Sequence, residues 1–137
     1  MENKTIHSAL LAAQTEFPGV KKDSTNPFFK SKYAGLDSIL EVVLPILHKH
    51  DLFIIQSPIT SGDRIGVKTS ICHTSGEKTE GEFTVALAKN DPQGAGSAIT
   101  YARRYALVAM LGLNVEDDDD ANGASNKKVA EKDDLDL

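Results

Sequence analysis

Residues 64–73 read Arg-Ile-Gly-Val-Lys-Thr-Ser-Ile-Cys-His, residues 80–89 read Glu-Gly-Glu-Phe-Thr-Val-Ala-Leu-Ala-Lys, and these two runs decide the fold. In the first run, Ile65, Val67, Thr69 and Ile71 alternate with Arg64, Gly66, Lys68 and Ser70. The second run alternates in the same way. A period of two is typical of a strand with one buried face and one face in water. We therefore expect two neighbouring antiparallel strands.

Turn signals give the connectivity of this sheet. Ser61-Gly62-Asp63 and Ser75-Gly76-Glu77 are credible hairpin turns before and after the first run. A β-rich run from Leu52 to Ser57 precedes the first turn. The sequence therefore predicts an antiparallel meander of about three strands.

Helical periodicity lies before the meander. Apolar spacing predicts a helix over Thr5 to Phe17, which Pro18-Gly19 ends. A polar, basic loop is expected from Val20 to Gly35. Asp37 is then the expected N-cap of a second helix, in which Pro45 should produce a kink or a restart.

A third and longer helix is expected after the meander. It should follow a glycine-containing loop at Lys89 to Gly96, run from about Ser97 to Leu111 and end at Gly112. Its apolar face would hold Ile99, Ala102, Ala106, Ala109 and Met110. The complete order predicts an α+β fold, with an antiparallel meander packed against a long C-terminal helix and two N-terminal helices.

Charge is unevenly distributed along the 137 residues. The net charge is −5, but residues 114–137 hold nine acidic residues and three lysines, a balance of −6. The remainder is close to neutral, with 12 basic and 11 acidic residues. We expect a folded domain over residues 1–113 and a disordered acidic tail over residues 114–137. The acidic total therefore does not exclude a nucleic-acid-binding protein.

Several chemical classes are disfavoured by the sequence. Cys72 is a lone cysteine, the spacing of a zinc site is absent, and no apolar run approaches the ~18 residues of a membrane span. Together with an N-terminus unlike a signal peptide, this predicts a cytoplasmic protein without a metal or cofactor. Gly76-Glu77-Lys78-Thr79 ends like a phosphate-binding loop but lacks the earlier glycine, so we expect no use of ATP. Asp117 to Asp120 permit a metal-dependent nuclease, although a solvated acidic run is the simpler interpretation.

Two segments have the chemistry of a nucleic-acid site. In the first, Asn26 to Tyr33, two lysines alternate with aromatics that either stack on bases or hold the loop on the core. The second, Asp91 to Tyr105, places glycines before an expected helix N-terminus, which suits a phosphate. One side of that helix offers Ser97, Thr100, Tyr101 and Arg104. A capped amphipathic helix with a solvated arginine is the alternative for this second segment.

Residues 96–107, Gly-Ser-Ala-Ile-Thr-Tyr-Ala-Arg-Arg-Tyr-Ala-Leu, closely resemble a signature of the ERF family, the "essential recombination function" single-strand annealing proteins of phages and prophages. Residues 26–34, 73–77, 89–93 and 116–119 also match the family in its order. The resemblance implies an ATP-independent, non-catalytic protein that forms a ring or filament on single-stranded DNA. It also implies a remote fold relationship with the eukaryotic single-strand annealing proteins.

The resemblance further implies a set of DNA contacts and partners. A phage exonuclease or a host single-strand-binding protein is the implied protein partner, and the bacterial cytoplasm is the implied location. A DNA-coating protein without annealing activity and a scaffold in phage–host conflict remain alternatives. The implied DNA contacts are Lys30, Lys32, Tyr33, Gln93, Ser97, Thr100, Tyr101, Arg103 and Arg104.

Overall fold

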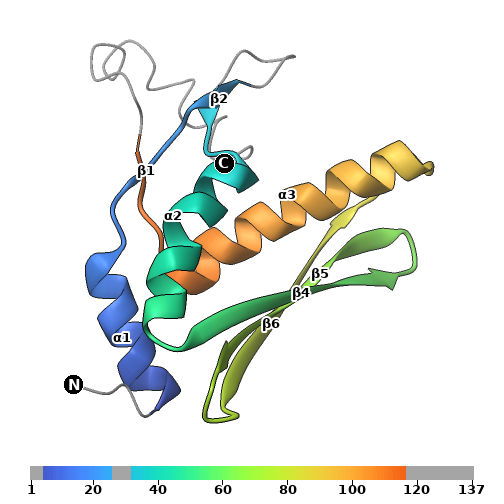
Figure 1. The fold of residues 1–137 in the computed structure, drawn as a ribbon. Coiled ribbons are helices and arrows are strands. Elements are labelled where there is room, and N and C mark those ends of the chain that lie inside the picture. Colours follow the sequence, from blue (N-terminus) through green and yellow to red (C-terminus); the bar gives the residue numbers. More distant parts are fainter. Residues whose placement is uncertain (1–4, 26–31, 117–137) are drawn as a thin grey trace.

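Three antiparallel strands form the main sheet of the computed structural model, which describes residues 5–25 and 32–116 (Figure 1). Strands β4 (Leu52–Ser61), β5 (Arg64–His73) and β6 (Lys78–Ala86) pair in chain order. Ser61 pairs with Arg64, so the first hairpin turns through two residues, and Gly62 has the positive φ of 62° that such a turn requires. The predicted meander is therefore confirmed.

The two faces of the sheet differ as their alternation predicts. Val67, Thr69 and Ile71 on β5 are buried beneath the third helix. Charged side chains on the other face form a polar cluster, in which Lys68 and Lys78 both lie 3.5 Å from a carboxylate oxygen of Glu80. One face is thus packed against a helix and the other carries charge, as in an α+β layer arrangement.

Two helices lie at one end of the sheet (Figure 1). Helix α1 (Ile6–Glu16) is capped by Thr5, whose hydroxyl accepts a hydrogen bond from the Ser8 N–H at 3.2 Å. Helix α2 (Leu36–Lys49) begins after Gly35 without a side-chain cap, so the prediction that Asp37 caps it is wrong. Asp37 lies inside the first turn instead, and its carboxylate accepts from the Ser38 N–H. Pro45 lies inside α2, which neither ends nor restarts there.

Helix α3 (Pro92–Leu111) crosses the buried face of the sheet over β5 and β6. It begins five residues before the predicted start, so the expected loop is wrong from Pro92 onward. Asp91 caps the helix through the Gly94 N–H at 2.7 Å, and Pro92 occupies the first turn, where its missing N–H costs nothing. The helix forms here although Gly94 and Gly96 each destabilise it by about 1 kcal/mol relative to alanine. Gly112, with φ of 67°, ends the helix as predicted.

Four short strands were not predicted from the sequence. β1 (Val20–Lys21) pairs in parallel with β7 (Val115–Glu116), and β2 (Ser24–Thr25) pairs antiparallel with β3 (Lys32–Tyr33). The basic segment that was expected to be a loop therefore begins and ends in paired strands. The β1–β7 pair also joins the chain after α3 to the chain after α1, so the described fold extends to Glu116.

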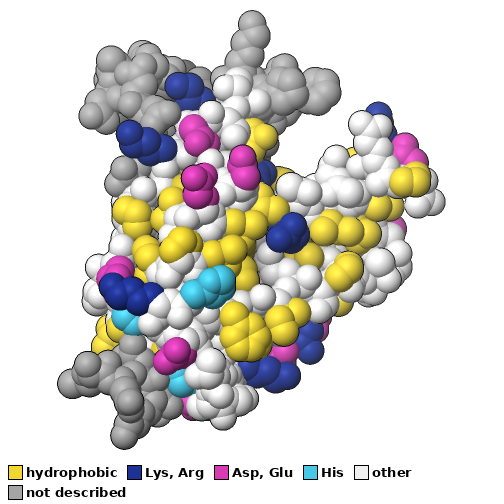
Figure 2. Space-filling view, viewed as in Figure 1, with side chains coloured by type: hydrophobic (Ala, Val, Ile, Leu, Met, Phe, Trp, Pro, Cys, Tyr) yellow, Lys and Arg dark blue, Asp and Glu magenta, His cyan; other side chains and the backbone are white. Residues whose placement is uncertain are grey.

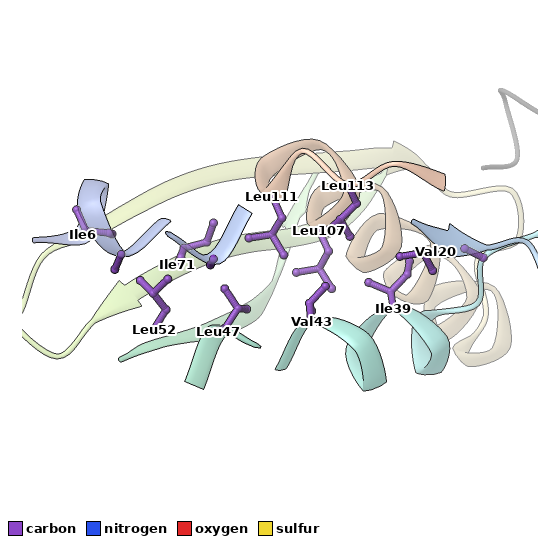
Figure 3. Packing of buried hydrophobic residues seen from close by; sticks show 13 residues of the cluster. Ile6, Val20, Ile39, Val43, Leu47, Leu52, Ile71, Leu107, Leu111 and Leu113 are labelled. Atoms are coloured by element: carbon purple, nitrogen blue, oxygen red, sulfur yellow. The ribbon is translucent and has the colours of Figure 1, made fainter. Parts of the chain in front are cut away.

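The main core joins all three helices to the sheet (Figure 3). Leu107 and Leu111 of α3 pack in one buried cluster with Val43 and Leu47 of α2. Among the larger members, the cluster continues through Ile6, Val20, Ile39, Leu52, Ile71 and Leu113. The C-terminal half of α3 is thereby fixed in the core, while its N-terminal half extends away from α2. No helix within residues 5–25 and 32–116 has the length and apolar character needed to cross a membrane.

Candidate nucleic-acid interface

Polar side chains of α3 line a cleft on the side of the helix away from the sheet. The cleft has a volume of about 730 Å³ and lies between α3 and the segment that includes Ser24, Tyr33 and the start of α2. Figure 2 shows the molecule hollowed between the body that contains α2 and the projecting part of α3. Six of the nine predicted DNA contacts line this cleft, namely Tyr33, Gln93, Ser97, Thr100, Tyr101 and Arg104.

Arg104 lies at the inner end of the cleft and is only 7% exposed. Its guanidinium carbon is 4.3 Å from the centre of the Tyr33 ring and 5.6 Å from that of Tyr101. These are cation–π distances, and a partly desolvated contact of this kind contributes about 0.5–2 kcal/mol. The solvated arginine that was the alternative for this helix is therefore wrong. Arg104 joins β3 to α3.

A row of aromatic rings supports this arginine from the sheet. Phe83 of β6 stacks on Tyr105 with ring centres 5.8 Å apart, and Tyr105 lies 4.4 Å from Tyr101. Arg104 lies 5.9 Å from the Tyr105 ring as well. A continuous row of aromatic rings therefore connects the wall of the cleft to the sheet.

Further along α3, the cleft presents polar groups to solvent. Gln93, Ser97 and Thr100 are exposed, and their side chains make no hydrogen bond to any part of the chain that is described. An amide and two hydroxyls, spaced by about one turn each, can donate to the oxygens of a phosphodiester strand. The cleft thus combines donors at its rim with a buried cation at its base.

Acidic groups limit where an anion can bind. Asp37 lines the cleft opposite α3. The Asp91 carboxylate accepts a hydrogen bond from the Gly94 N–H. The start of α3 is therefore not the open anion site that the sequence predicts. The glycine at 94 serves packing within the protein. A Cβ there would lie 2.2 Å from the Lys89 carbonyl oxygen, so the absence of a side chain allows the preceding loop to pack on the helix. A phosphate is therefore better placed beside Thr100 and Arg104.

Two of the predicted residues, Arg103 and Lys32, lie elsewhere. Arg103 points to the sheet, where its Nε donates to the Gln56 side chain at 3.0 Å. Lys32 is exposed on β3 beside Tyr33 but does not line the cleft. Lys30 lies outside the described residues. The structure therefore brings the other five predicted residues of α3 together with Tyr33, whereas Arg103 lies on the sheet side of the same helix.

Sequence reasoning missed part of the cleft wall. Ser24 lines it, and this residue carried no signal beyond an ordinary polar side chain. Asp37 had been assigned only to a helix cap. Its position opposite α3 depends on how α2 packs on the sheet, which local sequence patterns do not encode.

Within the described ranges, no three His, Cys, Asp or Glu side chains come together as a metal-binding group. The acidic run Asp117 to Asp120, on which the nuclease alternative depends, lies outside these ranges.

Comparison of the sequence with known proteins identifies the family of this chain. Residues 6–135 match the ERF superfamily, and the chain belongs to that superfamily. It is 31% identical over 126 residues to the essential recombination function protein of Salmonella phage P22. The alignment covers 88% of this chain and 59% of the phage protein, so the chain spans about three fifths of that relative's length. No solved structure matches the chain.

Proposed function

We propose that this protein acts in phage recombination by binding single-stranded DNA in the α3 cleft and helping complementary strands to anneal. Membership of the ERF superfamily and the name of the phage P22 relative support the recombination role. The observation that carries the DNA-binding part is the convergence of six predicted contacts from β3 and α3 on one cleft. Its donors suit a phosphodiester backbone, which carries no base information, so binding is indifferent to sequence.

Several subunits act together in this proposal. The described cleft has one arginine and one aspartate in its lining, so a single subunit neutralises few phosphates. Clefts aligned in a ring or filament would bind many phosphates at once, with an affinity that falls steeply with salt. Annealing draws its free energy from base pairing and stacking, and therefore proceeds without ATP. A bacterial cytoplasm and cooperation with an exonuclease or a host single-strand-binding protein are parts of the same proposal.

The binding test places a negative charge inside the cleft and an equal charge outside it. Thr100→Glu adds a carboxylate at an exposed cleft residue. Ala109→Glu adds one at a residue of α3 that does not line the cleft and that is exposed, although the sequence predicted it on the apolar face. Because like charges at contact distance repel by about 1 kcal/mol or more, we expect Thr100→Glu to weaken binding to labelled oligo(dT) about fivefold or more. Fluorescence anisotropy across a salt series measures both variants.

The outcome separates this cleft from a general charge effect. Ala109→Glu should bind like the wild-type protein, because it changes the net charge equally but lies outside the cleft. Equal weakening by both variants would remove the cleft from the DNA site. Binding without accelerated annealing would favour a coating protein, cleavage with magnesium would favour a nuclease, and no binding would favour a scaffold.

A further inference from the structure

A second pocket lies beside the cleft, between the end of β6 and the N-terminal half of α3. It has a volume of about 590 Å³ and is lined mainly by apolar atoms of Val85, Ala86, Ala88 and Ala98. Lys89 adds one cation to the lining. The loop that forms one wall is packed on α3 at Gly94, where any side chain would collide with the Lys89 carbonyl. The pocket is therefore built into the fold at a fixed place.

The pocket and the cleft share three side chains. Gln93, Ser97 and Tyr101 line both and follow one another at intervals of four residues. Residues four apart lie on one face of a helix, so these three form a ridge between the two hollows. A ligand in the cleft that reaches across the ridge enters the second pocket directly.

The cleft has the chemistry of a phosphate site, and the second pocket has the chemistry of a site for a base. The cleft offers hydroxyls and Arg104, which suit a phosphate. The second pocket offers apolar walls and the ring of Tyr101, which suit the flat, largely apolar surface of a base. Its volume lies in the usual range for small-molecule sites and is ample for a nucleoside.

We propose that this second pocket holds a nucleobase of the single strand whose backbone lies in the α3 cleft; this rests on the function proposed above. The Gln93 amide and Ser97 hydroxyl provide donors and acceptors at the ridge, so every base finds a partner. A base in the pocket is withheld from pairing. Each subunit therefore anchors the strand at one base, and the bases between anchors remain free to test a complementary strand.

The test compares two strands that differ only in their bases. One is oligo(dT), and the other has the same number of phosphates on sugars without bases. The wild-type protein should prefer oligo(dT) by about fivefold or more, since stacking one base on an aromatic ring is worth that much or more. Ala98→Leu fills the pocket from α3 and should abolish this preference, while its affinity for the baseless strand stays within about twofold of wild type.

Two further variants guard against misfolding and non-specific effects. Ala88→Leu fills the pocket from an exposed loop position and should act like Ala98→Leu without entering the helix. Ala109→Leu makes the same change at an exposed residue of α3 outside the pocket, and should keep the preference. Melting temperatures of all variants confirm that the fold is retained.

Failure of this inference is distinguishable from failure of the proposed function. A wild-type protein that binds both strands equally, or pocket-filling variants that keep the preference, would overturn the base pocket and leave DNA binding in place. A change in the sedimentation of the DNA-free protein on filling the pocket would assign it to a subunit contact, which also overturns the inference. Absence of binding to either strand would overturn the proposed function itself.

Discussion

At the scale of single residues, Arg104 is far more buried than a helical projection of the sequence indicates. Its guanidinium lies against Tyr33 and is almost completely buried, although it belongs to the polar side of α3. The family resemblance named both Arg104 and Tyr33 as DNA contacts, which stays a prediction, and the structure places both in the lining of one cleft. The resemblance gave no sign that the two side chains contact each other, because their contact depends on how β3 packs against α3.

The Tyr33–Arg104 contact should contribute measurably to stability. Tyr33→Ala removes the ring, and we expect it to lower the free energy of unfolding by about 1–2 kcal/mol. Tyr33→Phe keeps the ring and should cost less than about 0.5 kcal/mol, because the stacking face is preserved. Urea denaturation followed by circular dichroism measures both changes. Equal losses for the two variants would mean that the hydroxyl, and not the ring, carries the contact.

At the scale of elements, α3 serves the core with one half and the candidate site with the other. Leu107 and Leu111 fix its C-terminal half, and the cleft and second pocket lie along its N-terminal half. The three main strands and all three helices could be predicted from periodicity and turn signals. The early start of α3 could have been read from Asp91-Pro92, but the glycines at 94 and 96 favoured a loop. The short strands β1, β2, β3 and β7 were beyond prediction, since two-residue pairs have no periodicity.

A second link between elements joins α1 to the hairpin of β5 and β6. The Glu77 carboxylate accepts hydrogen bonds from the Ile6 N–H and the Ser75 hydroxyl, both at 2.9 Å. The Ile6 backbone, followed by Ser75, lowers the pKa of Glu77 below its ordinary value of 4.5. A carboxyl whose pKa is lower in the folded state stabilises the fold above its ordinary pKa, and this stabilisation disappears as pH falls through the folded pKa.

Replacement of Glu77 should therefore change how stability depends on pH. Glu77→Gln should be less stable than the wild-type protein at neutral pH, and the difference should shrink as pH falls below 4.5. Thermal unfolding at a series of pH values measures this difference. Glu82→Gln, at an exposed glutamate of β6, serves as the control. A difference between wild type and Glu77→Gln that stays constant with pH would contradict the assigned role of the carboxylate.

At the scale of the whole molecule, charge is separated along the chain. The net charge of −5 arises in residues 114–137, while the preceding residues carry slightly more basic than acidic groups. The candidate site belongs to that near-neutral part and presents few cations by itself. A single chain of this kind is expected to bind DNA weakly, and several chains acting together strongly. Assembly is therefore the property on which the proposed function most depends.

The candidate site could be predicted in part. Residue chemistry and the family resemblance located six of the cleft residues, because hydroxyls and an arginine at helical spacing are visible in the sequence. The opposite wall, with Ser24 and Asp37, and the second pocket arise from packing between distant segments. The two adjacent arginines also could not be told apart from the sequence. Arg104 lines the cleft, whereas Arg103 donates a hydrogen bond to Gln56 on the sheet.

The central claim is tested most directly by the annealing of two complementary labelled oligonucleotides without ATP across a salt series. The wild-type protein should accelerate pairing, the acceleration should fade as salt rises, and Thr100→Glu should reduce it while Ala109→Glu does not. Concentrations are chosen at which anisotropy shows the strands to be bound. Bound strands that pair no faster than free strands would contradict the claim that this protein anneals DNA.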